Sequence, residues 1–211
     1  MCILSEARAL AINGRSCSRA DAAFGLTAFV GNAAMMPEGL PEEEKEAWKQ
    51  KYVLPVVRAE GVTAGAITEP DAGSDTRGIK TTARLDGDEW VITGNKYWCT
   101  FADEADYINL LARVEAPGEE ERYKGLRSFI LEKPRGELPA GCQGSPIPKI
   151  GYFGWNTYEL AFDECRIPKE NIITGGGGEG FKNTVNMLNV ARCLLYTSDA
   201  ADDQGLGGVW G

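Results

Sequence analysis

The chain has 211 residues, of which 43% are hydrophobic and 25% charged, a balance typical of a globular protein. Its formal net charge is -9 without any basic block, so we expect neither a nucleic-acid partner nor binding to an anionic membrane surface. The chain contains no histidine, which excludes Ser-His-Asp and Cys-His catalysis and the common zinc sites, and we expect no metal site.

The first part of the chain is predicted to be helical. Residues 5–11 and 19–36 are rich in Ala, Leu and Phe without strand-like alternation, which predicts two helices. The longest uncharged stretch, residues 22–37, is too short to span a bilayer, so a buried helix is expected there. A further helix should begin at Pro41, which is followed by three glutamates, and Pro55 should end or kink it.

From Gly61 onward the pattern changes to short β-branched and aromatic runs between turn residues, which predicts an antiparallel β domain. The expected strands are residues 62–67, 79–85, 90–93, 96–100, 107–114, 126–131 and 158–162. Asp86-Gly87 predicts a hairpin, because glycine accepts the positive φ of a tight two-strand turn. Residues 115–124 are expected to form a charged surface loop.

The last part of the chain is predicted to contain a short helix. Residues 175–180 are rich in glycine and match G-x-G-x-x-G literally, but the βαβ context of a dinucleotide fingerprint is missing, so we reject that interpretation. Residues 181–192 have helical spacing. The tail from Cys193 matches the translation of a sequencing adapter, so we exclude residues 193–211 from the fold.

Six scattered cysteines lack Cys-x-x-Cys spacing, and no basic segment with an apolar core opens the chain. Reduced thiols in a cytoplasmic protein are therefore the simplest interpretation.

Two segments carry the strongest signal of a binding site. Residues 64–75 read AGAITEPDAGSD, and residues 94–100 read GNKYWCT. Small residues, a proline and hydroxyls at the end of a strand let the backbone approach a ligand and offer N–H and O–H groups to it. Taken alone, the first segment is equally typical of a turn whose Asp and Ser side chains cap local backbone groups.

The two segments together resemble the acyl-CoA dehydrogenase flavoproteins, which carry a Thr-Glu-Pro-x-Ala-Gly-Ser-Asp run and then Gly-x-Lys-x-Trp-Ile-Thr. The resemblance implies an α+β fold in which remnant N-terminal helices precede a central β-barrel or sandwich and the start of a C-terminal helical bundle. The implied divisions are residues 1–60, 61–174 and 175–192, followed by the non-native tail at 193–211.

The resemblance also implies a set of FAD-binding residues. Gly65, Ile67, Thr68 and Ser74 would line the flavin and its pyrophosphate. Trp98 would pack beside the isoalloxazine ring, and the Thr100 hydroxyl would lie near flavin N5 and O4. Because residues two apart on a strand share a face, Trp98 and Thr100 should point together while Cys99 points away. We do not expect Cys99 to be a redox thiol, since no cation adjoins it in sequence.

Other matches concern the substrate. Ser74, Asn189 and Arg192 would lie near the acyl-CoA, although Asn189 replaces a commoner Asp. Residues 149–168 resemble the next family signature, which we interpret as structural, and Trp155 stands where a smaller residue is usual. The catalytic glutamate of the family is expected beyond Arg192, so we expect this fragment to contain no catalytic residue and to be inactive.

The implied reaction of the parent enzyme is FAD-dependent α,β-dehydrogenation of an acyl-CoA to the trans-2-enoyl-CoA, as in fatty acid β-oxidation. Its implied partners are an electron-transfer flavoprotein and other subunits of a homotetramer or homodimer. Two alternatives stay open: a non-catalytic flavin-binding or interaction module, and a related flavin monooxygenase or nitroalkane oxidase on the same scaffold.

Overall fold

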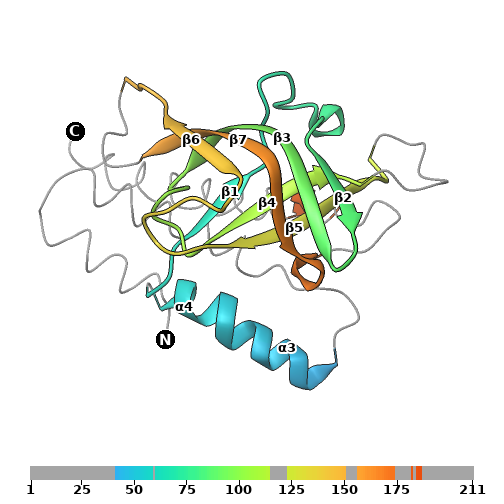
Figure 1. The fold of residues 1–211 in the computed structure, drawn as a ribbon. Helices are drawn as coiled ribbons and strands as arrows, with labels where there is room; N and C mark the ends of the chain where they lie inside the picture. Colours follow the sequence, from blue (N-terminus) through green and yellow to red (C-terminus); the bar gives the residue numbers. More distant parts are fainter. Residues whose placement is uncertain are drawn as a thin grey trace, which may run out of the picture.

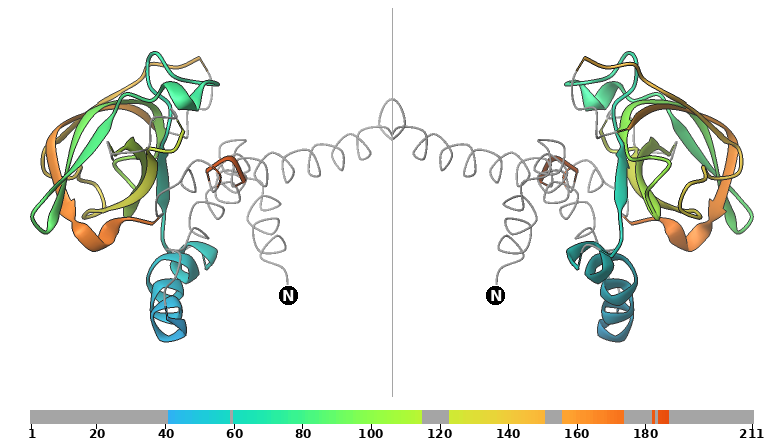
Figure 2. Two further views of the ribbon diagram at one scale, coloured as in Figure 1. Left: turned by 90° about the vertical axis from the view of Figure 1, so that its right-hand side faces the viewer. Right: turned by 90° about the vertical axis from the view of Figure 1, so that its left-hand side faces the viewer.

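The computed structural model describes residues 41–58, 60–114, 123–150, 156–173, 182 and 184–186. Among these, a strongly curled sheet packs beside one interrupted helix (Figures 1 and 2). The helices expected at residues 5–11 and 19–36, the glycine-rich segment 175–180 and the tail 193–211 lie outside the described residues. Of the helix expected at residues 181–192, the described residues, Lys182 and 184–186, are helical.

The helical segment begins where the sequence predicts and is interrupted before its proline. Helix α3 covers Glu42–Trp48, a π-turn η1 covers Lys49–Val53, and α4 covers Leu54–Val57. The three glutamates of its first turn suit the positive end of the helix dipole. Pro55 lacks an N–H, and its ring would crowd the carbonyl four residues earlier. The regular α-helical hydrogen-bond pattern is therefore replaced by the wider π-helical pattern before this residue.

Seven strands form one sheet that curls on itself. They are β1 Thr63–Ala66, β2 Thr82–Asp86, β3 Glu89–Thr100, β4 Tyr107–Arg113, β5 Leu126–Glu132, β6 Cys142–Pro146 and β7 Thr157–Pro168. Short 3₁₀ turns cover Thr76–Gly78 and Lys169–Asn171. The path runs β1-β4-β2-β3-β7-β6, and β5 pairs with β4.

The expected β domain is confirmed, and its sheet is mixed. Pairs β2–β3, β3–β7, β4–β5 and β6–β7 are antiparallel, whereas β1 and β2 both pair with β4 in parallel. The expected hairpin joins β2 to β3, where Asp86 pairs with Glu89 and Gly87 has a φ of +66°. This positive φ is the reason for glycine at the turn.

One strand prediction was wrong, and one strand was not predicted. The segments expected at residues 90–93 and 96–100 form the single strand β3. Gly94 does not interrupt this strand, and its missing side chain lets the backbone pass close to Thr81. Strand β6 was not predicted, since it reads Cys-Gln-Gly-Ser-Pro and only its first residue is buried. An edge strand with this composition has no apolar alternation to mark it.

The core lies inside the curled sheet. Ile92, Ile108, Leu110 and Phe129 are fully or almost fully buried in it, and Trp90 meets Phe129 edge to face at 5.3 Å between ring centroids. A second cluster holds the helical segment against the sheet through Tyr52, Val56, Tyr107, Ile130 and Ile173. Its buried hydroxyls are satisfied: Tyr107 donates to the Tyr52 carbonyl at 2.8 Å, and Tyr52 donates to Glu132 at 2.7 Å.

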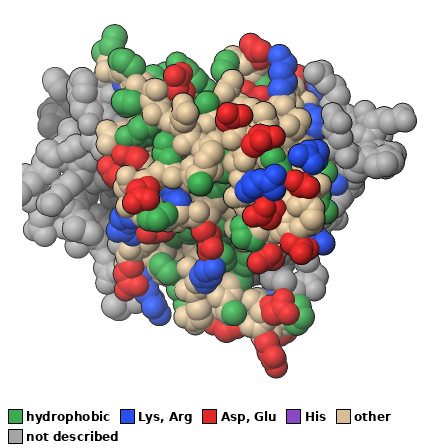
Figure 3. Space-filling model, in the orientation of Figure 1, with side chains coloured by type: hydrophobic (Ala, Val, Ile, Leu, Met, Phe, Trp, Pro, Cys, Tyr) green, Lys and Arg blue, Asp and Glu red, His purple; other side chains and the backbone are tan. Residues whose placement is uncertain are grey.

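The surface carries charge of both signs. On the face shown in Figure 3, acidic and basic side chains of the described residues are interspersed. Within the described part of the chain, no helix is both long and apolar enough to cross a membrane.

Candidate functional site

The two sequence motifs meet in the fold. The backbone N–H of Tyr97, in β3, donates to the carbonyl of Thr68 at 2.7 Å, just beyond the end of β1. The Lys96 ammonium donates to the Ile67 carbonyl at 3.0 Å. Residues that lie about thirty positions apart in sequence are therefore held side by side, as a shared binding wall requires.

The Thr-Glu-Pro-Asp-Ala run forms a tight turn. Glu69 and Ala72 exchange two backbone hydrogen bonds, of 3.0 and 3.1 Å, around Pro70 and Asp71. Proline fixes the φ that the second position of such a turn needs. The turn directs the Glu69 side chain inward, where only 5% of it is exposed.

A buried ion pair joins the two motifs. The Lys96 ammonium, with no exposed surface, lies 2.9 Å from Glu69 Oε1. The same carboxylate accepts the backbone N–H groups of Lys80 at 2.7 Å and Thr81 at 2.9 Å. A buried ion pair is favourable only when such additional hydrogen bonds satisfy its atoms, and here they do.

The pKa shifts of the pair follow from this environment. Burial lowers the pKa of Lys96 to about 8, although the attraction of Glu69 opposes the shift. Burial would raise the pKa of Glu69, but the Lys96 charge and the N–H donors outweigh it and keep that pKa below its usual value. Both groups are therefore charged at neutral pH and hold the motifs together.

A bulge in β3 sets the direction of Trp98. The pairing with β7 steps from Lys96 opposite Leu160 to Cys99 opposite Tyr158, so β3 has one extra residue there. Trp98 takes a left-handed φ of +61°, which is rare for a bulky residue. Its indole is 52% exposed and meets the Tyr97 ring at 5.1 Å, in an edge-to-face arrangement.

Trp98, Cys99 and Thr100 differ in burial, and the bulge interrupts the simple alternation on which the expected division of faces rests. Cys99 is fully buried, Trp98 is exposed and Thr100 is partly exposed. Burial raises the pKa of the Cys99 thiol to about 12, against a smaller opposing effect of Lys96. A thiol in this environment is unreactive, in agreement with the expectation that Cys99 is no redox group.

Beside Trp98, three polar side chains lie in a row. Thr100 Oγ1 lies 3.3 Å from Thr157 Oγ1 of β7, and the Lys149 ammonium donates to Thr157 Oγ1 at 2.9 Å. Thr100 and Thr157 are direct partners in the β3–β7 register. Thr157 is 5% exposed.

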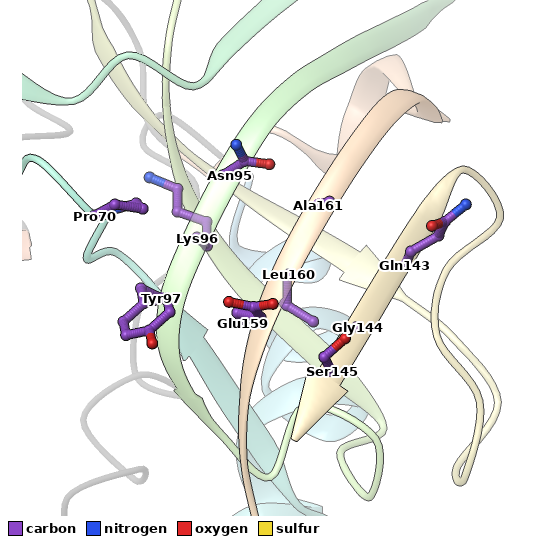
Figure 4. Close-up of a pocket in the computed structure, with 10 residues that line it drawn as sticks. All are labelled: Pro70, Asn95, Lys96, Tyr97, Gln143, Gly144, Ser145, Glu159, Leu160 and Ala161. Atoms are coloured by element: carbon purple, nitrogen blue, oxygen red, sulfur yellow. The ribbon is translucent and has the colours of Figure 1, made fainter. Parts of the chain in front are cut away.

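A hollow of about 350 Å³ adjoins the motifs over β3, β7 and β6. Figure 4 shows Lys96 extended from β3 toward Pro70, with Gln143 and Ser145 lining the opposite side from β6. Glu159 of β7 lies between them. The lining combines polar and apolar residues, and it includes Asn95, Lys96 and Tyr97 of the motif that carries Trp98.

The remaining predicted residues are only partly brought together. Gly65 lies in β1 opposite Asn109, and Ile67 packs on a small cluster around Ile79. Ser74 is exposed in the loop before η2. No hydrogen bond within the described residues joins Ser74 to Trp98 or Thr100. Asn189, Arg192 and the base expected beyond them lie outside the described residues.

Several residues of this region were not singled out from the sequence. Lys96 and Glu69 belong to the motifs, but their pairing needs the fold. Lys149 and Thr157 belong to a segment interpreted as structural, and only the β3–β7 register reveals that Thr157 faces Thr100. Among the described residues, no group of three or more His, Cys, Asp or Glu could hold a metal ion.

Comparison with known proteins identifies the β domain. The family model described as "Acyl-CoA dehydrogenase, middle domain" matches residues 64–165. Among curated relatives, (2S)-methylsuccinyl-CoA dehydrogenase of Cereibacter sphaeroides is 37% identical over 73% of this chain and 28% of its own length. The mitochondrial short-chain specific acyl-CoA dehydrogenase of Homo sapiens is 34% identical over 87% of this chain and 43% of its own length.

Solved structures agree with the sequence match. A glutaryl-coenzyme A dehydrogenase in complex with glutaryl-CoA is 32% identical and superposes with a TM-score of 0.63, covering 77% of this chain and 38% of that chain. The present chain thus spans less than half the length of these relatives.

Proposed function

The chain belongs to the acyl-CoA dehydrogenase family, and from this membership we propose that its β domain forms one wall of the FAD site of an acyl-CoA-oxidising enzyme. One observation carries the proposal: the Tyr97 N–H to Thr68 carbonyl bond and the Lys96–Glu69 pair hold both motifs together. In our proposal, the exposed indole and the polar groups of β3 form a single surface with the loop that follows β1.

The residues of this surface fit a flavin. A planar ring needs an apolar partner, and Trp98 offers a half-exposed indole that a strained backbone keeps outside the core. The polar edge of the ring needs hydrogen-bond donors, and in our proposal the hydroxyl of Thr100, a partly exposed residue, is one of them. Donors of this kind stabilise negative charge as it develops on a ligand.

The cofactor of the family is FAD, which when bound supplies a hydride acceptor at N5. In our proposal, Trp98 and Thr100 orient the ring, while Gly65, Ile67 and Thr68 bring backbone close to it. Ser74 lies on the exposed loop that follows and would contact the pyrophosphate and the acyl-CoA. Asn189 and Arg192 would complete the substrate site from the helical segment.

The proposed reaction is dehydrogenation of an acyl-CoA thioester to the trans-2-enoyl-CoA. A thioester α-proton is too weakly acidic for a carboxylate in water, so donors on the thioester carbonyl must stabilise the enolate-like charge. We propose that the described β domain binds and orients, and that the proton acceptor lies outside the described residues. A preparation of the present chain should accordingly not bleach bound FAD when butyryl-CoA is added, and bleaching would contradict this assignment.

Further parts of the proposal concern the biological setting. An electron-transfer flavoprotein would accept the electrons, the enzyme would act in fatty acid β-oxidation as a homotetramer or homodimer, and the compartment would be the cytoplasm. The human relative, by contrast, is named as mitochondrial.

Titration with FAD tests the cofactor site. We expect saturable quenching of flavin fluorescence by the purified chain, because stacking on an indole quenches the excited ring. Trp98→Ala should weaken binding by about tenfold, the equivalent of about 1.4 kcal/mol for a lost aromatic contact. Leu85→Ala removes another exposed apolar side chain, on β2, and should leave binding unchanged. Equal effects of the two substitutions would contradict the proposed site.

A further inference from the structure

A row of three polar side chains leads from Lys149 to the proposed flavin wall. The Lys149 ammonium donates to Thr157 Oγ1 at 2.9 Å, and Thr157 Oγ1 lies 3.3 Å from Thr100 Oγ1. An ammonium group can only donate, so the direction of the first bond is fixed. The second bond joins two hydroxyls, either of which could be the donor.

The burial of Thr157 determines which of the two threonines donates in the second hydrogen bond. Thr157 is 5% exposed, so its hydroxyl proton needs an acceptor inside the protein. Among the described residues, Thr100 Oγ1 is the acceptor within reach of that proton. Thr100 then receives a hydrogen bond from Thr157 and keeps its own proton. Because Thr100 is partly exposed, this proton can point away from Thr157, toward the exposed side of the residue.

We propose that Lys149 and Thr157 are positioning residues that fix the Thr100 hydroxyl as an outward-facing donor toward the bound flavin. The inference rests on the proposed function for its ligand, but the orientation of the hydroxyl is a property of the protein alone. Without Lys149, Thr157 could accept from Thr100, and the Thr100 proton would turn inward.

The charge of Lys149 adds a second effect. A hydroxyl that accepts from a cation is a stronger donor, and hydrogen bonds in a chain strengthen one another. The polarisation passes from the ammonium through Thr157 to Thr100. A donor strengthened in this way favours the electron-rich reduced flavin over the oxidised form. The hydrogen-bonded row of Lys149, Thr157 and Thr100, here called the relay, therefore raises the reduction potential of the flavin.

The first arm of the test needs no flavin. In the wild-type chain, ¹³Cβ signals of Thr100 and Thr157 and the exchange rates of their hydroxyl protons are measured by NMR. Lys149→Met should shift the signals of both threonines, whereas Lys149→Arg, which keeps a cationic donor, should leave them near their original positions. Lys80→Met removes an exposed lysine elsewhere and should move neither. A response confined to Thr157 would overturn the relay.

The second arm uses FAD and measures its reduction potential on the chain. Lys149→Met and Thr157→Val should both lower the potential, in the same direction as Thr100→Val, and Thr157→Ser should restore it. FAD binding should weaken by about threefold to tenfold in Thr100→Val, as expected for one lost hydrogen bond. An unchanged potential in both Lys149→Met and Thr157→Val would overturn the inference even if binding falls.

The two experiments distinguish a failure of the proposed function from a failure of the relay. If the wild-type chain does not bind FAD, the proposed function is contradicted, while the NMR arm still decides the orientation of Thr100. If FAD binds and the threonine signals respond independently, the proposed function stands and the relay is wrong. Should Lys149→Met fail to fold, Thr157→Val and Thr157→Ser provide the same comparison.

Discussion

At the scale of single residues, the buried pair of Lys96 and Glu69 is what holds the site together. Lysine and glutamate are almost never fully buried unless they are paired. Here the pair joins the middle of β3 to the turn that follows β1, and two backbone N–H groups complete the carboxylate's hydrogen bonds. The motif residues Thr-Glu-Pro and Lys-x-Trp thus have a structural task as well as their proposed flavin contacts.

Removing one partner of the Lys96–Glu69 pair should lower the free energy of unfolding strongly. Lys96→Met leaves the Glu69 carboxylate buried without its cation, and we expect the free energy of unfolding to fall by about 3 kcal/mol. Urea unfolding followed by tryptophan fluorescence measures the loss. Lys80→Met, which breaks an exposed pair with Asp71, is the matched control and should change stability little. Equal losses in the two variants would show that burial of the pair is unimportant.

The same pair predicts a dependence on pH. The pKa of Lys96 is about 8 in the folded state and ordinary, near 10.5, in the unfolded chain. Between these values the unfolded chain binds more protons, so the contribution of Lys96 to stability rises with pH across this window. We expect the unfolding free energy of the wild type, minus that of Lys96→Met, to increase from pH 8 to pH 10. A difference that stays flat or decreases would contradict the assigned pKa shift.

At the scale of elements, strand β3 carries two unusual backbone positions, and each has its own consequence. Gly94 has a φ of +146°, and a Cβ there would lie 2.6 Å from the Thr81 backbone. Gly94→Ala should therefore destabilise the fold by more than about 2 kcal/mol, since both strain and overlap must be relieved. Gly87→Ala, at the hairpin, meets no atom within 4 Å and should cost about 1 kcal/mol from its positive φ alone. Thermal unfolding of both variants measures the difference.

The bulge at Trp98 predicts a reversal of the usual order of stability between glycine and alanine variants in a strand. In a strand, glycine is normally less stable than alanine by about 0.5–1 kcal/mol. At Trp98, with a φ of +61°, the left-handed backbone penalises any Cβ by about 1–2 kcal/mol. Trp98→Gly should therefore be more stable than Trp98→Ala, whereas Thr93→Gly should be less stable than Thr93→Ala. The same order at both positions would mean that the bulge carries no strain.

The sequence predicted most of the elements, and its failures have physical causes. Strands that are buried along almost their whole length, such as β4 and β5, were found, because this burial gives them short runs of apolar residues. Strand β6 has no such apolar run. Gly94 is typical of a strand end, although strand β3 continues through it. The bulge could not be foreseen, since it depends on how β3 pairs with β7.

The candidate site was predictable in part for a related reason. Trp98, Thr100 and Thr68 were identified because they lie in contiguous motifs. Lys149 and Thr157 were not singled out, because register, a long-range property, decides which hydroxyls face each other.

At the scale of the whole molecule, the described residues form a β domain, and the candidate site occupies one region of its sheet. Trp98 and Thr100 belong to β3 and the hollow lies over β3, β7 and β6, while the helical segment packs against the sheet through Tyr52. In relatives more than twice as long, further chain is available to complete such a site. The net charge of -9 means that an anionic cofactor must be held by backbone donors and a few local cations rather than by the overall field.

Amide chemical-shift mapping of the ¹⁵N-labelled chain during titration with FAD tests the central claim most directly. We predict shifts concentrated at Thr68, Tyr97, Trp98 and Thr100, with the indole N–H of Trp98 among the most strongly affected signals. Amides of β5 and of the helix α3 should stay in place. Shifts spread evenly over the chain, or centred away from these two motifs, would contradict a flavin wall at this face.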